Sequence, residues 1–311
     1  MSEANSTITY DHDDTRKNAV LIDSFFLHQP ESLPAALSLL AEHPEETRVL
    51  AGGSELILLL KMGLAAAEHV VNIKRISGLA RLDYEPNSKI LRIGPLITHR
   101  ALEKSEVVCN HFPLIVEMEK QLANVRVRNV GTLAGNLSFA EPHADPGTLL
   151  LAYEASVRLR SLEGERTLAV RDFFVDYYET ALKRNELLTE IEIPKPSEKS
   201  TGAYLRFCPG ERPMVGAAVF LEWKNGVCEN ARLALGCVAP TPIRISEVEE
   251  WMAGMSREEI LADVNGIAEK AARICQPLED VWGSVEYKRQ IVKILVARNI
   301  ASLAQRTDNN G

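Results

Sequence analysis

The chain has 311 residues, of which 46% are hydrophobic and 25% charged, a composition typical of a soluble globular protein with two or three domains. Its formal net charge of −8 argues against a nucleic-acid-binding protein, which would need a basic face. No apolar stretch approaches the ~20 residues needed to span a bilayer, and residues 1–17 have neither the basic start nor the apolar core of a secretion signal. We therefore expect a disordered arm over residues 1–19 and a cytoplasmic protein without a membrane span.

The first part of the chain predicts helices and strands around a glycine-rich loop. A predicted helix at 34–41 precedes a short apolar strand at 48–51, which leads into Gly52-Gly53-Ser54 and a helix at 55–62. Glycine has no Cβ, so its backbone can approach a ligand closely. The order strand, Gly-Gly-Ser, helix is that of a phosphate-binding loop, although the patterns of nucleoside triphosphatases and of Rossmann domains are both absent.

A second loop of the same kind is Gly131-Thr-Leu-Ala-Gly-Asn136. It follows predicted strands at 69–73 and 89–93 and predicted helices at 100–105 and 112–123. One glycine loop by itself is more often an ordinary turn. Two in one chain, each expected to offer backbone N–H groups, suggest a ligand with two phosphates that is held from both sides.

The rest of the chain divides at a proline pair. Residues 148–157 are apolar, and the four aromatic residues within 171–182 have a helical spacing that favours a place in the core. A predicted strand at 186–193 ends at Pro194-Lys195-Pro196, the best candidate for a domain boundary. Beyond it we expect strands at 203–207, 215–223 and 231–238, and helices at 247–253, 257–274 and 285–304.

Neither the cysteines nor the histidines predict a metal or catalytic site. The five cysteines contain no Cys-x-x-Cys pair, so a zinc ribbon or an iron–sulfur cluster held by this chain alone is improbable, and free thiols are expected. His143 is interpreted as a solvated loop residue, and His99, next to the helix-capping Thr98, as a structural one. No Ser/His/Asp arrangement is evident, so we expect no catalytic residue and no metal ligand.

Four ordered stretches resemble one protein family. They are residues 49–56, residues 127–137 continuing to Ala144-Asp145, residues 172–194 and residues 280–289. Together they resemble the FAD-binding medium subunits of molybdenum hydroxylases, a family that includes the carbon monoxide dehydrogenase medium subunit and the FAD-binding subunit of bacterial xanthine dehydrogenases. The resemblance extends from about residue 26 to about residue 304. Any one glycine loop is a weak signal, whereas the ordered set is specific.

The resemblance implies an α+β fold. An FAD-binding domain of the vanillyl-alcohol-oxidase (PCMH) type would span residues 20–196, as two subdomains at about 20–80 and 81–196. A C-terminal α+β domain of the carbon monoxide dehydrogenase flavoprotein type would follow at residues 202–306.

The resemblance also implies which residues would bind FAD. Gly52-Gly53-Ser54 would meet the pyrophosphate through backbone amides and a hydroxyl, Asp145 would accept a hydrogen bond from a ribose or ribityl hydroxyl, and Leu188 would pack near the adenine or the flavin. The full set is Val49, Leu50, Ala51, Gly52, Gly53, Ser54, Glu55, Leu56, Leu122, Gly131, Thr132, Gly135, Asn136, Asp145, Leu188 and Arg206.

Two positions depart from the family pattern. Ala134 stands where relatives usually have a second glycine, so a methyl group is added to the second loop. Arg206 stands about where relatives often place a lysine near the isoalloxazine ring, and a planar guanidinium binds differently from an ammonium point charge.

The function implied by the resemblance is electron transfer. A large partner would carry the molybdenum cofactor, a small partner two iron–sulfur clusters, and this chain would pass electrons through FAD to NAD or a quinone-type acceptor. Two alternatives remain open: a stand-alone flavin-dependent oxidoreductase of the same fold, and a non-catalytic phosphate-binding protein. The substrate of the complex, whether carbon monoxide, a purine, an aldehyde or an N-heterocycle, is not identified by this sequence.

Overall fold

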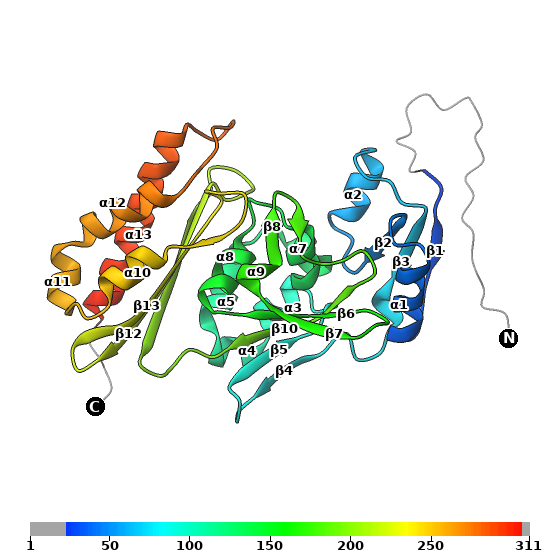
Figure 1. The fold of residues 1–311 in the computed structure, drawn as a ribbon, viewed down its shortest axis with the longest axis horizontal. Helices are drawn as coiled ribbons and strands as arrows, with labels where there is room; N and C mark the ends of the chain where they lie inside the picture. Colours follow the sequence, from blue (N-terminus) through cyan, green and yellow to red (C-terminus); the bar gives the residue numbers. More distant parts are fainter. Residues whose placement is uncertain (1–22, 307–311) are drawn as a thin grey trace.

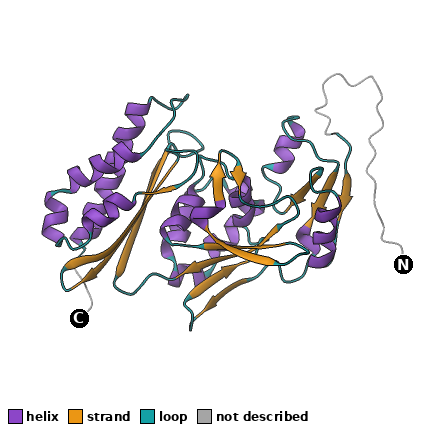
Figure 2. Cartoon of the chain, in the orientation of Figure 1, coloured by secondary structure: helices purple, strands orange, loops and turns teal. Residues whose placement is uncertain are grey.

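The computed structural model describes residues 23–306, so the predicted arm at 1–19 lies outside the described residues. Of the four sheets in the described residues, the three larger ones follow one another along the longest axis of the molecule (Figure 1). Strands and helices are mixed throughout, and the C-terminal helices gather on one side of the last sheet (Figure 2). This is the α+β architecture expected from the sequence. Within the described residues, no helix combines the length and the apolar character needed to cross a bilayer.

The N-terminal part is a small parallel sheet in the order β1-β3-β2. Helix α1 buries Ala36, Leu37 and Leu40 beside this sheet, and it begins where the Ser32 hydroxyl accepts a hydrogen bond from the backbone N–H of Ala35. The elements are β1 (Phe26–His28), α1 (Leu33–Glu42), β2 (Thr47–Leu50), α2 (Leu56–Lys61), β3 (His69–Asn72) and the 3-10 helix η1 (Ile73–Arg75).

The central part is a five-stranded antiparallel sheet in the order β4-β5-β10-β6-β7, with helices packed against it. Every residue of α8 is buried, and its C-terminal half, residues 149–152, belongs to the hydrophobic cluster of the central part. The elements are β4 (Leu82–Glu85), β5 (Ile90–Ile93), α3 (His99–Lys104), α4 (Glu106–His111), α5 (Pro113–Gln121), α6 (Val125–Val130), α7 (Leu133–Phe139), α8 (Asp145–Ala152), β6 (Ser156–Arg160), β7 (Glu165–Ala169), α9 (Val170–Phe173), β8 (Phe174–Asp176), β9 (Glu179–Thr180) and β10 (Leu187–Pro194).

The C-terminal part is an antiparallel sheet, β11-β12-β13-β14, with one face covered by helices α10–α13 (Figure 1). Its other face packs on the central part, because Ala218 and Phe220 of β12 belong to the central cluster while Val219 and Leu221 belong to the helical one. The elements are β11 (Ser200–Phe207), β12 (Val215–Lys224), β13 (Val227–Gly236), β14 (Ile243–Arg244), α10 (Ser246–Met252), α11 (Arg257–Ala262), α12 (Val264–Ile274) and α13 (Val285–Gln305).

Two expectations from the sequence are wrong in detail. The single helix expected at 257–274 is two helices, which meet at Asp263. The aromatic run at 171–182 is a short helix followed by the β8–β9 hairpin, so only its two phenylalanines pack in the core. Tyr177 and Tyr178 are 38% and 55% exposed. The spacing of these aromatic residues suggested a helix, but over so short a run the same spacing also occurs in a helical turn followed by a tight hairpin.

Candidate functional site

The two glycine loops are in direct contact. A Cβ at position 52 would overlap the carbonyl oxygen of Val130 and lie 2.9 Å from the Cα of Gly131. The second loop is fixed in turn by the N–H of His99, which donates to the carbonyl oxygen of Gly131 over 3.0 Å. Glycine is therefore required at position 52 because another segment of backbone occupies the space of a side chain.

A cavity of about 860 Å³ opens between the loops, lined also by α2, the β8–β9 hairpin and residues 211–213. Three of the predicted residues lie behind its wall: Leu50 contacts the Gly53 position, Gly131 lies against Gly52, and Arg206 is bonded to Asp145. The other predicted residues line the cavity: Val49, Ala51, Gly52, Gly53, Ser54, Glu55, Leu56, Leu122, Thr132, Gly135, Asn136, Asp145 and Leu188.

Within residues 23–306, the first loop presents a continuous run of free backbone donors. Gly53 has a φ of +90°, and within residues 23–306 the N–H groups of Gly53, Ser54 and Glu55 donate no hydrogen bond. In the second loop, by contrast, the N–H of Gly135 donates to the Thr132 hydroxyl over 3.0 Å, and the N–H of Asn136 donates to the Thr132 carbonyl. A run of unsatisfied amides beside a glycine-lined cavity fits a diphosphate, so the residues present suit FAD.

Asp145 connects the central part to the C-terminal sheet. Its side chain is 3% exposed and accepts a 2.6 Å hydrogen bond from the Tyr204 hydroxyl and a second bond from the Arg206 guanidinium. Burial raises the pKa of Asp145, and Arg206 and Tyr204 oppose that rise. Arg206 therefore lies in an ion pair behind the cavity wall, whereas the sequence suggested a position beside the flavin.

A cluster of polar side chains, of which the sequence indicated only Glu55, lines part of the cavity. Arg212, from the loop after β11, pairs with Glu141 and lies 4.0 Å from the carboxylate of Glu55. The hydroxyl of Tyr178 donates to Glu141 over 2.9 Å. Glu141 lies within the stretch that resembles the family, whereas no local signal marks Arg212. This cluster connects the first glycine loop and the segment after α7 to the C-terminal part.

The Glu141 cluster predicts acid sensitivity. Burial raises the pKa of Glu141, but a hydrogen bond with His143, the charge of Arg212 and the Tyr178 hydroxyl outweigh burial and hold it at about 2. A depressed carboxyl pKa stabilises the folded state above the ordinary value of 4.5 and loses that contribution as the pH falls toward about 2. We expect Glu141→Gln to lose less unfolding free energy than the wild type between about pH 6 and about pH 3, measured by urea denaturation. Glu247→Gln, at an exposed pair, should behave like the wild type; equal acid losses in all three proteins would contradict the assignment.

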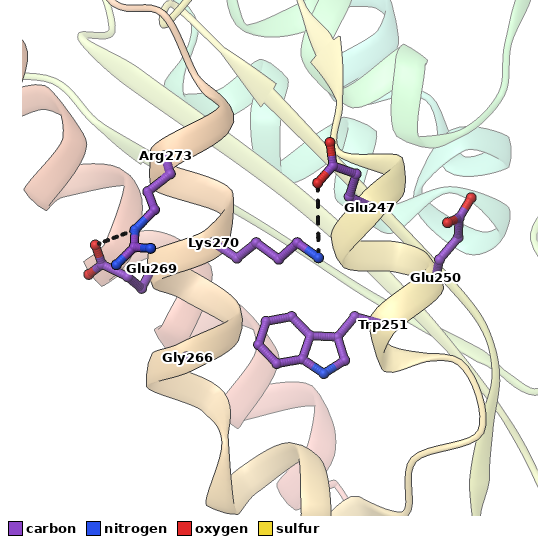
Figure 3. A pocket seen from close by; sticks show the side chains of 7 residues that line it. All are labelled: Glu247, Glu250, Trp251, Gly266, Glu269, Lys270 and Arg273. Atoms are coloured by element: carbon purple, nitrogen blue, oxygen red, sulfur yellow. Dashed lines mark hydrogen bonds and ion pairs between the residues drawn. The ribbon is translucent and has the colours of Figure 1, made fainter.

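A second hollow, of about 790 Å³, lies between α10 and α12 and is lined by none of the glycine-loop residues (Figure 3). Lys270 lies over the ring of Trp251 at 5.0 Å and 3.9 Å from Glu247, and Arg273 pairs with Glu269 at 3.3 Å. These side chains largely satisfy one another across a shallow surface, so this hollow is a weaker candidate than the cavity at the loops.

Comparison with known protein families agrees with this geometry. Residues 23–196 match the family described as the FAD binding domain in molybdopterin dehydrogenase, and residues 209–303 match the C-terminal domain of the carbon monoxide dehydrogenase flavoprotein. The fold and the site thus define an FAD-binding flavoprotein subunit of an oxidoreductase. The chain belongs to the molybdenum hydroxylase family of such subunits.

Relatives and solved structures of the same family cover nearly the whole chain. The medium chain of carbon monoxide dehydrogenase from Afipia carboxidovorans is 32% identical over 288 residues, which are 92% of this chain and 99% of the relative. Caffeine dehydrogenase subunit beta from a Pseudomonas species is 32% identical over 89% of this chain and 94% of the relative. Quinoline 2-oxidoreductase from Pseudomonas putida 86 superimposes with a TM-score of 0.86 at 27% identity, over 92% of this chain and 98% of that one.

Proposed function

We propose that this chain holds FAD in the glycine-loop cavity and serves as the electron-transfer subunit of a molybdenum hydroxylase complex. The observation that carries the proposal is the free amide run at Gly53, Ser54 and Glu55, which faces a cavity large enough for a dinucleotide. Bound FAD would supply the redox chemistry. The chain's own part is to bind the diphosphate, to orient the ring system and to shield it from water.

The roles of individual residues follow from their positions. Gly53, Ser54 and Glu55 would donate their N–H groups to the diphosphate, and Asn136 would add its side-chain amide from the second loop. Leu122 and Leu188 would pack against the ring systems from the cavity wall. Asp145, already bonded to Tyr204 and Arg206, would accept a further bond from a ribose or ribityl hydroxyl with a remaining lone pair.

The partners and the acceptor belong to this proposal as well. Curated relatives are named as medium chains or beta subunits, including the caffeine dehydrogenase subunit, which supports a place in a complex with other subunits. We assign the iron–sulfur clusters to a small partner and the molybdenum cofactor to a large one. The acceptor is of the NAD or quinone type.

Co-expression with the candidate partner subunits tests the proposal. We expect a yellow complex that contains FAD, iron and molybdenum, and whose flavin is reduced by substrate only when all subunits are present. Anaerobic reoxidation by NAD and by a soluble quinone, measured separately, identifies the acceptor. Turnover of a small substrate by this chain alone would instead support the stand-alone oxidoreductase, and a colourless chain that cannot be reconstituted with FAD would contradict both.

A further inference from the structure

His99 is buried and yet lines the cavity. It is the first residue of α3, its backbone is fixed to Gly131, and its side chain is only 2% exposed. A Cβ at position 131 would lie 3.3 Å from His99 Cδ2 and 3.3 Å from the Ser54 hydroxyl oxygen. The imidazole ring and the Ser54 hydroxyl therefore converge on the point where the two glycine loops meet.

One nitrogen of the His99 ring is held by a buried carboxylate. Nδ1 lies 2.9 Å from one carboxylate oxygen of Glu119 and 3.1 Å from the other, and Glu119, on α5, is fully buried. Within residues 23–306, Nε2 of His99 makes no hydrogen bond, and it is not among the polar atoms enclosed by protein without a partner. Because His99 lines the cavity and Nε2 is not enclosed by protein, this unsatisfied nitrogen is available to a ligand there.

Whether Nε2 of His99 can donate a hydrogen bond depends on the protonation of the His99–Glu119 pair. A neutral His99 beside a Glu119 carboxylate can take up one further proton. Either that proton makes His99 a cation, or it sits on Glu119, whose O–H then donates to Nδ1. In both arrangements Nε2 of His99 carries a hydrogen. Without that proton the pair carries a net negative charge in a buried place. Burial raises the pKa of Glu119, His99 opposes the rise, the nearby Asp145 adds to it, and Arg128 has the smallest, opposing effect. A raised pKa of Glu119 favours the arrangement in which the pair keeps its proton, and in that arrangement Nε2 is a donor.

We infer that His99, oriented by Glu119, donates its Nε2–H to a diphosphate oxygen of the bound FAD. This inference rests on the proposed function. Two features of the site support the diphosphate as the acceptor: the neighbouring Ser54 amide and hydroxyl face the same space, and a donor without a protein partner is matched best by an anionic oxygen. His99 is a cofactor-positioning residue, and Glu119 acts through it.

The test compares ligands with and without phosphates. Apo-protein labelled with ¹⁵N-histidine is titrated with FAD, ADP and riboflavin, and the Nε2 resonance of His99 is followed by NMR. We expect FAD and ADP to shift this resonance and riboflavin to leave it unchanged. This measurement needs no mutation, so it stays decisive even where substitution of a buried pair disturbs folding.

Substitutions at His99 and Glu119 measure how much this contact contributes to FAD and ADP affinity. His99→Phe combined with Glu119→Met removes both polar partners, so no buried carboxylate is left unpaired, and we expect FAD and ADP to bind roughly 10- to 100-fold more weakly. His99→Gln keeps an N–H donor and should recover part of the FAD affinity. His111→Phe, outside the cavity and stacked on Tyr84, is the matched control and should bind like the wild type.

The possible results distinguish failure of the proposed FAD-binding function from failure of the inferred contact between His99 and the diphosphate. Wild-type protein that binds no FAD contradicts the proposed function together with this inference. Wild-type protein that binds FAD, with an Nε2 resonance indifferent to FAD and ADP or a double variant of unchanged affinity, overturns the inference alone. Equal weakening of FAD and riboflavin also overturns it, because the contact would then lie on the flavin side.

Discussion

Replacing Gly53 by aspartate is expected to give a folded protein that does not retain FAD. At a φ of +90°, an L side chain is strained, and its Cβ would lie 2.8 Å from the Leu50 side chain. The larger effect is electrostatic, because the new carboxylate would stand at the amides that are proposed to bind the diphosphate. Like charges in contact cost several kcal/mol, so we expect FAD affinity to fall at least about 100-fold, measured as flavin absorbance per protein and by titration of the apo-protein.

Gly78→Asp is the matched control for this substitution. Gly78 has a φ of +84°, nothing lies within 4 Å of its Cβ position, and it does not line the cavity. The control therefore introduces the same charge and a similar backbone strain, about 1–2 kcal/mol, away from the proposed diphosphate. It should be slightly less stable and fully yellow. If both variants retain FAD equally, the first loop is an ordinary turn and the diphosphate binds elsewhere.

Local features of the site could be predicted because they depend on residues that are close together in the sequence. The order β2, Gly-Gly-Ser, α2 follows from a short apolar run, two glycines and a second apolar run, and the structure has these elements. That Gly52 touches Val130 could not be derived from spacing, because the two segments are far apart in the chain. The pairing of two glycine loops suggested one ligand held from both sides, and the resemblance, which orders both loops in one pattern, made that site specific.

The same limit explains the residues that were missed. Arg212 lies in a loop without a motif, and its meaning comes only from Glu141 and Glu55, which the fold brings to it. His99 was interpreted as structural, and its bond to buried Glu119 is compatible with that reading; its place in the cavity lining could not be derived from the sequence. The second loop was expected to offer backbone amides, yet the N–H groups of Gly131, Leu133, Gly135 and Asn136 are all taken by other protein oxygens. The sequence gives the residue types at the site, whereas tertiary contacts determine which hydrogen-bond donors remain unpaired.

Asp145→Asn is expected to be the most destabilising single change at the site. The side chain of Arg206 is mostly buried, and Asp145 is the carboxylate with which it pairs. Breaking a buried pair on one side leaves an uncompensated charge and costs about 3–5 kcal/mol. Since Asp145 begins α8 and Arg206 lies on β11, the loss falls on the contact between the central part and the C-terminal sheet. Urea denaturation of the apo-protein measures it without any contribution from the cofactor.

A double-mutant cycle with Arg206→Met separates the ion pair from packing. Removing both charges leaves no unpaired guanidinium, so the double variant should be less destabilised than the sum of the single variants by roughly 1–3 kcal/mol. Burial raises the pKa of Asp145, so a different outcome also has a physical reading. If Asp145→Asn unfolds like the wild type, the Asp145 carboxyl is neutral in the folded protein and forms no ion pair with Arg206. Additive losses would show that Tyr204 and packing, rather than Arg206, hold the two parts together at this point.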